Sequence, residues 1–297
     1  MSEKLSVNLL ASTDPSISFD KTSTPLIIDA FQDRGHDVTL KSVEETLTAT
    51  ELLDCDVFID RSPITDTDFF RSLALERLSL RRQNKKAPLM VDNPFATMSS
   101  LDKRKTRKLM PEFVPEGYNL DGESNHQAIS HFEEDEWVVI KDPLGWYSRG
   151  MDRVSPEEAH DKYGSARDMT VEKYVPFIRG VGRVLTMNHG ANFQVVCSYL
   201  MVPDSWRTGE GVSVTHELTD CPDDLRLFAH DVTKRSGLYL NGMDYIERAA
   251  EDRTEGQNKY ALLEVNAVPN LRVPLHYLGV DAPGKFAEHV EQSALQR

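Results

Sequence analysis

The fold is decided by one stretch late in the chain, Ala261-Leu-Leu-Glu264-Val-Asn266-Ala-Val-Pro269. In it, an apolar run leads into an acid and an amide two residues apart. Side chains alternate between the two faces of a strand, so Glu264 and Asn266 share one face and Val265 lies on the other. Carboxylate and amide oxygens together suit a hard divalent cation such as Mg²⁺. The alternative is a strand end that carries two exposed polar residues.

The preceding segment supplies a partner for this strand. Leu238–Ile246 is a second apolar stretch and carries Asp244, and the polar run Glu251–Lys259 between the two stretches is typical of a hairpin loop. If the two strands pair, oxygen ligands from Asp244, Glu264 and Asn266 converge. The sequence therefore predicts a metal site on one face of an antiparallel hairpin.

Composition argues against several classes of protein. The 297 residues carry a formal net charge of −14 and are 39% apolar, which is ordinary for a globular chain of two or three sub-domains. An acidic chain disfavours general nucleic-acid binding, which needs a basic surface. No apolar run approaches the length of a membrane span, and the first residues lack the pattern of a signal peptide. The widely spaced Cys55, Cys197 and Cys221 indicate reduced thiols, so we expect a cytoplasmic protein.

The first third of the chain alternates strand and helix patterns. The expected strands are Lys4–Leu10, Val38–Leu40, Val57–Ile59 and Pro88–Val91. The expected helices are Leu26–Asp33, with Gly35 as its stop, and Asp66–Arg82. Such alternation is typical of a parallel α/β sheet.

The later part of the chain has an antiparallel pattern. The expected strands are Gly182–Met187, Phe193–Met201 and Val212–Thr215, joined by short turns. A helix is expected from Cys221 to about Ser236.

A candidate phosphate-binding segment lies in the middle of the chain. Glu136–Lys141 is an apolar strand that ends in a lysine, and the loop after it carries Gly145, Ser148 and Gly150. This order can place an ammonium group and backbone N–H groups around phosphates. It is not the G-x-x-x-x-G-K-[ST] loop, because the lysine precedes the glycines.

Two further segments carry alternative interpretations. Ser99–Met110 holds five Lys or Arg residues. We expect a helix there that begins at Ser99 or Ser100, with Asp102 in its first turn and the charges mostly forming a solvated face, one or two of them facing a phosphate. Met169–Pro176 is a short strand with a Pro-ended connector, which is either an adenine-binding edge or a plain interdomain hinge.

In their order along the chain, these parts resemble the ATP-grasp superfamily of carboxylate–amine ligases, most closely its branch of glutathione synthetase and the ribosomal S6 modification enzyme. The resemblance extends to about Leu271 and is most specific at the strands of Asp244 and Glu264. Ile140-Lys141-Asp-Pro and the glycines after it are similar to the family's ATP lysine and flexible loop. Asp102-Lys103 matches an earlier ATP-contacting lysine, with Lys105 as the alternative.

The resemblance implies a role for each candidate residue. Arg183 and Arg207 would act on the substrate or the acylphosphate. Asp244, Glu264 and Asn266 would hold Mg²⁺, with Mn²⁺ as an alternative ion. ATP would be bound by Lys103, Lys141, Gly145, Ser148, Gly150, Glu172, Lys173, Tyr174 and Val175. The loops Gly145–Gly150 and Trp206–Gly211 would act as lids.

Three departures from the family pattern weaken a subfamily assignment. Val181 stands where the family often has an acid that contacts the ribose. The usual Arg-x-Asn of the later loop is Arg207-Thr-Gly209, and Asp142 separates Lys141 from the proline.

The implied architecture is an α/β (α+β) chain of three parts. These are an N-terminal parallel α/β domain at 1–95, a central lid domain at 96–175 with the ATP lysines and glycine loop, and a C-terminal antiparallel-sheet domain at 176–297. The implied activity is an ATP-dependent ligase that joins small amino-acid or peptide-like carboxylate and amine substrates through an acylphosphate. The alternatives are a small-molecule kinase and a nucleotide-binding regulatory module. The resemblance also implies a homodimer or homotetramer, and the composition predicts a protein that binds neither nucleic acid nor membrane.

Overall fold

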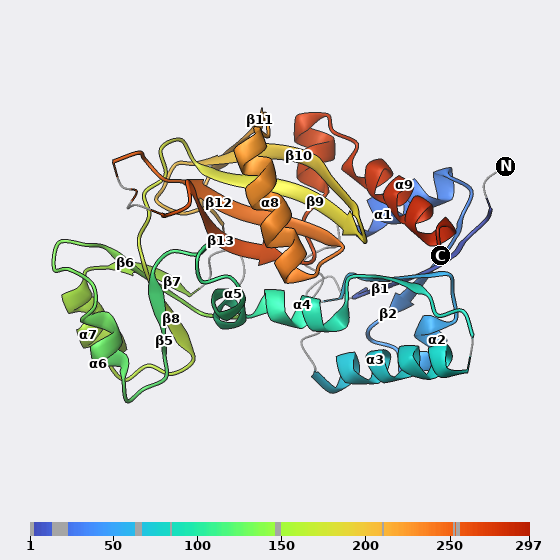
Figure 1. The fold of residues 1–297 in the computed structure, drawn as a ribbon, viewed down its shortest axis with the longest axis horizontal. Coiled ribbons are helices and arrows are strands. Elements are labelled where there is room, and N and C mark those ends of the chain that lie inside the picture. The colour runs from blue at the N-terminus through green and yellow to red at the C-terminus, as the bar shows by residue number, and fades with distance from the viewer. Residues whose placement is uncertain are drawn as a thin grey trace.

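Three sheets build the molecule, and they follow one another across its long axis (Figure 1). The computed structural model describes residues 3–13, 23–62, 67–83, 85–145, 150–209, 211–251, 253 and 256–297. The two chain ends lie together at one end of the molecule, and the sheet formed within residues 117–173 lies at the other (Figure 1).

The first sheet is parallel, as the alternation of strand and helix patterns predicts. Its order is β2-β1-β3-β4, and each neighbouring pair is parallel. The strands are β1 (Ser6–Ala11), β2 (Asp37–Ser42), β3 (Val57–Asp60) and β4 (Leu89–Val91). The helices of this part are α1 (Thr24–Asp33), α2 (Ala49–Leu53) and α3 (Thr67–Arg82).

The second sheet is antiparallel and has the order β11-β10-β9-β12-β13. Its strands are β9 (Val181–His189), β10 (Asn192–Pro203), β11 (Val214–Thr219), β12 (Leu240–Glu247) and β13 (Tyr260–Asn266). Helix α8 (Asp223–Ser236) covers one face, where Leu225, Phe228 and Val232 pack against Met243 and Leu262. The helix ends at Gly237, whose φ of 70° is the left-handed conformation that favours glycine.

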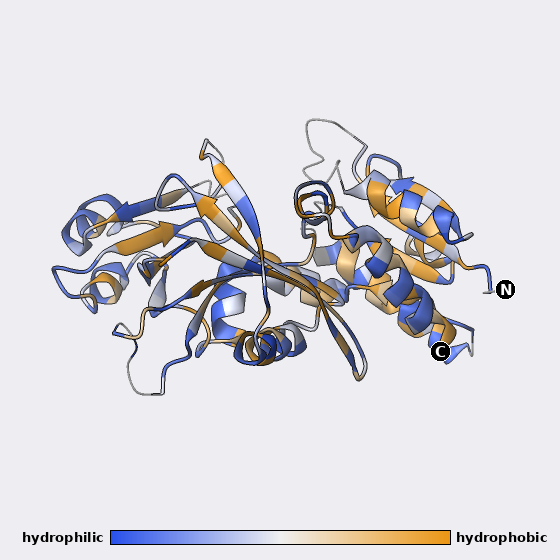
Figure 2. Ribbon diagram, turned by 90° about the horizontal axis from the view of Figure 1, so that it is seen from above, coloured by the Kyte–Doolittle hydropathy of each residue, from blue (hydrophilic) through white to orange (hydrophobic). Residues whose placement is uncertain are grey.

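The opposite face of this sheet joins it to the parallel sheet in one core. Phe286 and Val290 of α9 (Ala282–Leu295) are fully buried among residues of both sheets, including Leu9 and Leu185. Helix α9 lies beside α1 near the chain ends (Figure 1). Figure 2 shows hydrophobic residues along the strands and hydrophilic residues on the outer loops, as expected when apolar area is removed from water.

The third sheet has the order β5-β8-β6-β7 and is also antiparallel. Its strands are β5 (Gly117–Leu120), β6 (Val138–Lys141), β7 (Met151–Val154) and β8 (Met169–Lys173). Helices α6 (Asn125–Ile129) and α7 (Pro156–Tyr163) pack on one face, where Ile129, Ala159 and Ile140 are fully buried. The other face of this sheet is therefore left to line the pocket described below.

The expectation of one helix over Ser99–Met110 is wrong about where the helix begins. The structure has two helices, α4 (Pro94–Leu101) and α5 (Lys103–Leu109). Asp102 is the N-cap of α5 rather than a first-turn residue, because its carboxylate accepts a hydrogen bond from the Arg104 backbone N–H at 2.9 Å. Ser100 lies in α4 and donates its hydroxyl hydrogen to the Thr97 carbonyl.

Other local expectations can be compared directly. A π-helical turn, η1 (Val273–Tyr277), follows the last strand. All three cysteines are free, as expected, and Cys197 is buried in the core. Among the helices of the described residues, none has the length and apolar character needed to cross a bilayer. The proposed boundaries of the three domains stay a prediction.

Candidate active site

The site begins where β12 and β13 pair, as the sequence predicts. Asp244 lies opposite Glu264, and Gly242 lies opposite Asn266. The register shifts between Asp244 and Tyr245, which leaves Leu263 as an extra residue in β13. Bulges of this kind redirect side chains, and both Leu263 and Glu264 line the same pocket.

Asp244 is paired with an arginine from the neighbouring strand. The Arg183 guanidinium donates to both carboxylate oxygens of Asp244, at 2.5 Å from Nε and 2.6 Å from Nη2. Burial alone would lower the pKa of Arg183, but the charge of Asp244 raises it well above its ordinary value. This bidentate pair places a permanent cation against the predicted metal ligand.

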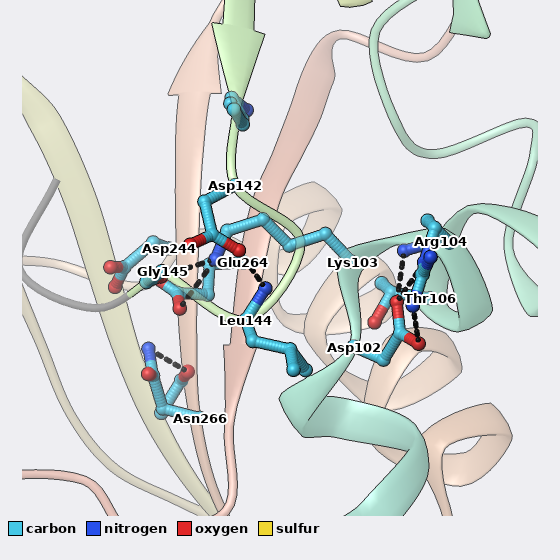
Figure 3. Close-up of polar contacts among 12 residues, drawn as sticks. Asp102, Lys103, Arg104, Thr106, Asp142, Leu144, Gly145, Asp244, Glu264 and Asn266 are labelled. Atoms are coloured by element: carbon cyan, nitrogen blue, oxygen red, sulfur yellow. Dashed lines mark hydrogen bonds and ion pairs between the residues drawn. The ribbon is translucent and has the colours of Figure 1, made fainter. Parts of the chain in front are cut away.

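Glu264 lies near a lysine of α5. The Lys103 ammonium is 3.7 Å from Glu264 Oε1 and donates to the Gly145 carbonyl oxygen at 2.6 Å. Figure 3 shows the Lys103 side chain extending from α5 toward Gly145 and Glu264. Lys103 therefore connects the glycine loop to the strand that carries the acid.

The donor set at these strands suits a hard cation. Asp244 and Glu264 offer carboxylate oxygens, and the Asn266 amide donates through Nδ2 to the Gly242 carbonyl at 3.2 Å, which leaves Oδ1 as an acceptor. The described residues contain no cluster of three or more His, Cys, Asp or Glu side chains able to hold a metal. A metal here would therefore need the amide and phosphate oxygens as well, which is common for Mg²⁺. The oxygen donors of Asp244, Glu264 and Asn266 fit a divalent cation, while Arg183 and Lys103 lie against the same two acids.

A second charged cluster lies on the third sheet. Buried Lys141 forms an ion pair with Glu172 of the adjacent strand, and Arg107 Nη2 lies 2.6 Å from the other Glu172 oxygen. Burial would raise the pKa of Glu172, but the charges of Lys141 and Arg107 outweigh it and lower the pKa below its ordinary value. Glu172 is therefore ionised at neutral pH and bound by two cations.

One pocket collects most of the predicted residues, and the second and third sheets form its two walls. From the third sheet and the connector after it come Val139, Lys141, Met151, Glu172, Lys173, Tyr174 and Val175. From the second sheet and its loop come Val181, Trp206, Arg207, Asp244, Ile246, Leu263 and Glu264. Lys103 of α5 also lines the pocket.

Two further contacts involve residues that the sequence predicts for the site. Lys173 forms an ion pair with Glu136 at the rim. The carbonyl of Gly150 accepts from the Asp142 backbone N–H at 3.2 Å, which closes the base of the glycine loop. Ser148 and the rest of residues 146–149 lie outside the described residues.

Sequence reasoning missed the part that Arg107 plays. Lys105 and Lys108 are exposed, as expected of a solvated face, whereas the side chains of Lys103 and Arg107 are each only 12% exposed. The signal was available, since these two residues are four apart and share one face of a helix. The acid that Arg107 pairs with is distant in sequence, so the pairing itself could not be predicted.

Comparison with known proteins supports the fold. No protein-family model and no curated protein matches the sequence. The ATP-grasp ligase PsnB, solved with a minimal precursor, has a TM-score of 0.70 at 16% identity, covering 98% of this chain and 100% of that chain. The D-cycloserine synthetase DcsG has a TM-score of 0.67 at 16% identity, covering 97% and 99%. A RimK-domain ATP-grasp protein from Sphaerobacter thermophilus DSM 20745 has a TM-score of 0.61 at 18% identity, covering 96% and 99%. The chain therefore has the ATP-grasp fold, as its sequence predicts.

Proposed function

We propose that this chain, with its ATP-grasp fold, is an ATP-dependent carboxylate–amine ligase that forms an amide or peptide bond and releases ADP and phosphate. The observation that supports it most is a single pocket in which Lys103, Lys141 and Arg207 meet Asp244 and Glu264. Phosphoryl transfer requires cations that neutralise the phosphates and acids that bind a divalent ion opposite them.

The first step would activate the substrate carboxylate. Its oxygen attacks the γ-phosphorus of ATP, the bond from that phosphorus to the ADP oxygen breaks, and an acylphosphate forms. The ammonium groups of Lys103 and Lys141 would lie along the phosphate chain and neutralise its charge. Glu172 would hold Lys141 in place before the nucleotide binds.

The second step would form the amide. The unprotonated amine attacks the acyl carbon, a C–N bond forms, and the C–O bond to phosphate breaks. The nitrogen loses one proton, which leaves with the phosphate as hydrogen phosphate. Arg183 and Arg207 would stabilise the negative charge that develops on the acyl oxygen and on the leaving phosphate. The loops Gly145–Gly150 and Trp206–Gly211 would exclude water, which otherwise hydrolyses the acylphosphate.

Asp244, Glu264 and Asn266 are the residues that would hold Mg²⁺. When bound, the ion would supply charge neutralisation between the phosphates. Solved structures of PsnB contain Mg and ADP, which supports the choice of ion. The use of Mn²⁺ in its place stays a prediction, as does a dimer or tetramer.

The similar structures suggest which substrates to test. PsnB is solved with a precursor peptide and DcsG is a synthetase of D-cycloserine. The macrocyclase MdnC is solved with its precursor peptide MdnA. We therefore propose substrates in the range from amino acids to short peptides.

The proposal is tested by an ADP-release screen over pairs of amino acids and short peptides, with mass spectrometry of the products. We expect one or more pairs to give ADP, phosphate and a product whose mass is the sum of the substrates minus water. A stable phosphorylated product formed without an amine would instead indicate a kinase. No ADP release over the whole panel would argue for a module without turnover.

A further inference from the structure

One guanidinium group lies among three aromatic rings at the rim of the pocket. The Arg153 Cζ atom is 5.2 Å from the ring centroid of Trp137, 4.9 Å from that of Tyr174 and 5.3 Å from that of Trp206. Tyr174 and Trp206 also meet edge to face, with centroids 6.2 Å apart. We refer to these four residues as the aromatic latch. A cation within about 6 Å of a ring centroid is attracted to the ring face.

Three members of the latch belong to the third sheet and its connector. Arg153 lies opposite Val139 in the β6–β7 pair, and Val139 lies opposite Glu172 in the β6–β8 pair. Directly opposite residues share a face, so Arg153 lies on the same face as the pocket residues. The Tyr174 backbone N–H donates to the Trp137 carbonyl at 2.8 Å, which fixes these two latch residues beside each other.

The fourth member comes from the opposite wall of the pocket. Trp206 belongs to the loop between β10 and β11, and the next residues, Arg207 and Thr208, line the pocket together with it. The loop is closed at its base, where the Asp204 backbone N–H donates to the Ser213 carbonyl at 3.1 Å. The latch therefore joins the two walls across the rim of the pocket.

Among the described residues, the charge of Arg153 is directed at aromatic rings and not at an acid. Within that part of the chain, Arg153 forms no ion pair with any carboxylate, and its guanidinium lies beside the three rings. Its placement among rings that belong to both walls indicates a contact that holds the walls together.

We propose that the aromatic latch positions Arg207 and controls the entry and release of the nucleotide. The contact of Trp206 with Arg153 holds the β10–β11 loop across the rim of the pocket. The nucleotide enters or leaves when this contact opens. The inference rests on the proposed function, because it assumes that the pocket binds ATP and ADP. Arg153, Trp137 and Trp206 are positioning residues, since they act through the loop and not on the reacting atoms.

The test measures release of ADP rather than turnover. A fluorescent ribose-labelled ADP is bound to the protein with Mg²⁺ and displaced by excess ADP in a stopped-flow instrument. We expect Arg153→Gln and Trp206→Ala each to speed release about tenfold, in line with a cation–π contact of moderate strength. The double variant Arg153→Gln/Trp206→Ala should release no faster than the faster single variant, because both remove the same contact.

Conservative variants and a matched control separate positioning from general damage. Arg153→Lys and Trp206→Phe keep a cation and a ring, so release should stay within about twofold of the wild type. Arg179→Gln removes an exposed arginine that pairs with Glu217 outside the latch, and its release rate should not change. In steady-state assays, Arg153→Gln and Trp206→Ala should each show a higher KM for ATP and a lower kcat than the wild type, because Arg207 loses its position.

The outcomes distinguish the two proposals. If the wild type binds no labelled ADP, the proposed function fails, and the latch fails with it. If the wild type binds ADP but Arg153→Gln and Trp206→Ala release it at the wild-type rate, the latch alone is overturned. Additive effects in the double variant would also overturn it, because the two residues would then act separately.

Discussion

At the scale of single residues, the site depends on how buried charges are paired. Glu172 is 6% exposed and is held between Lys141 and Arg107. Without it, two buried cations would face each other with no compensating charge, which is costly in a medium of low dielectric. The pair therefore holds the Lys141 side chain in place before any phosphate arrives.

Glu172→Gln should destabilise the protein in a pH-dependent way. At about pH 7 we expect a loss of about 3–5 kcal/mol in the free energy of unfolding, because a buried ion pair is broken. The pKa of Glu172 is lowered from 4.5 in the folded state. The stabilisation of the folded state by ionised Glu172 is therefore complete above pH 4.5, and it is lost as the pH falls through the lower folded-state pKa.

Urea unfolding over a range of pH checks this prediction. The difference between wild type and Glu172→Gln should shrink as the pH falls below 4.5. Glu136→Gln is the control, because the Lys173–Glu136 pair is more exposed and should contribute less than about 1 kcal/mol. A difference between wild type and Glu172→Gln that is independent of pH would contradict the account of Glu172.

Glu264→Ala tests the acid of the predicted metal site. We expect ADP formation to be lost while the melting temperature changes little, because the Glu264 side chain is 32% exposed in the pocket wall. Glu247→Ala is a matched control on the neighbouring strand, where Glu247 pairs with Lys259 outside the nucleotide pocket. Normal ADP formation by Glu264→Ala would remove this residue from the site.

At the scale of elements, one carboxylate ties the parallel sheet to the second sheet. Asp92 directly follows β4, and its Oδ1 accepts from the backbone N–H of Tyr239 at 2.7 Å and of Leu240 at 3.2 Å. Its φ of 67° is a left-handed conformation, which Asp and Asn tolerate better than other side chains. Burial raises the pKa of Asp92 to about 7, and the two hydrogen bonds only partly oppose the increase.

The prediction here compares two substitutions at one position. Asp92→Ala should cost about 1–3 kcal/mol for each backbone N–H left unpaired. Asp92→Asn keeps an acceptor and tolerates the same φ, so it should cost much less. Ionising an acid with a raised pKa destabilises the fold, so the Asn variant should gain stability relative to the wild type as the pH rises from 3.8 to about 7. Equal unfolding free energies for the Ala and Asn variants would refute the role of Asp92 as a tie.

The element scale also shows where sequence patterns were sufficient. Apolar runs predicted β13 and its partner β12, and the alternation of side chains along a strand predicted the shared face of Glu264 and Asn266. The bulge at Leu263 was not predictable, since a single extra residue leaves no signal in an apolar run. The division into α4 and α5 was missed because Asp102 suits an N-cap and a first turn almost equally.

At the scale of the whole molecule, the parallel sheet and the antiparallel sheet were predictable, and the contacts between distant side chains were not. Hydrophobic patterns specify which segments form strands, but they do not state which distant side chains meet. Arg153 meets Trp206 only because the two antiparallel sheets face each other across the pocket. The pairing of Arg107 with Glu172 joins α5 to β8, and Arg183 lies opposite Asp244 where β9 pairs with β12 inside the second sheet.

The core shared by the parallel sheet and the second sheet leads to a prediction about the stability of the whole molecule. Phe286 of α9 is fully buried in the cluster that joins the parallel sheet to the second sheet. Phe286→Ala should cost about 3–5 kcal/mol, because it leaves a cavity where the two sheets meet. Leu295→Ala, at a 44% exposed position of the same helix, is the control and should change stability little. Calorimetry should show one shared transition in the wild type, and two well-separated transitions would contradict a common core.

The central claim is that this pocket activates a carboxylate with ATP. The most direct measurement is ADP release with a productive carboxylate–amine pair, made side by side on wild type, Lys141→Ala and the Arg179→Gln control. For both the wild type and the control, we expect one amide product for each ADP released. We expect no ADP above background from Lys141→Ala, with folding checked by circular dichroism. Wild-type turnover by folded Lys141→Ala would contradict the account.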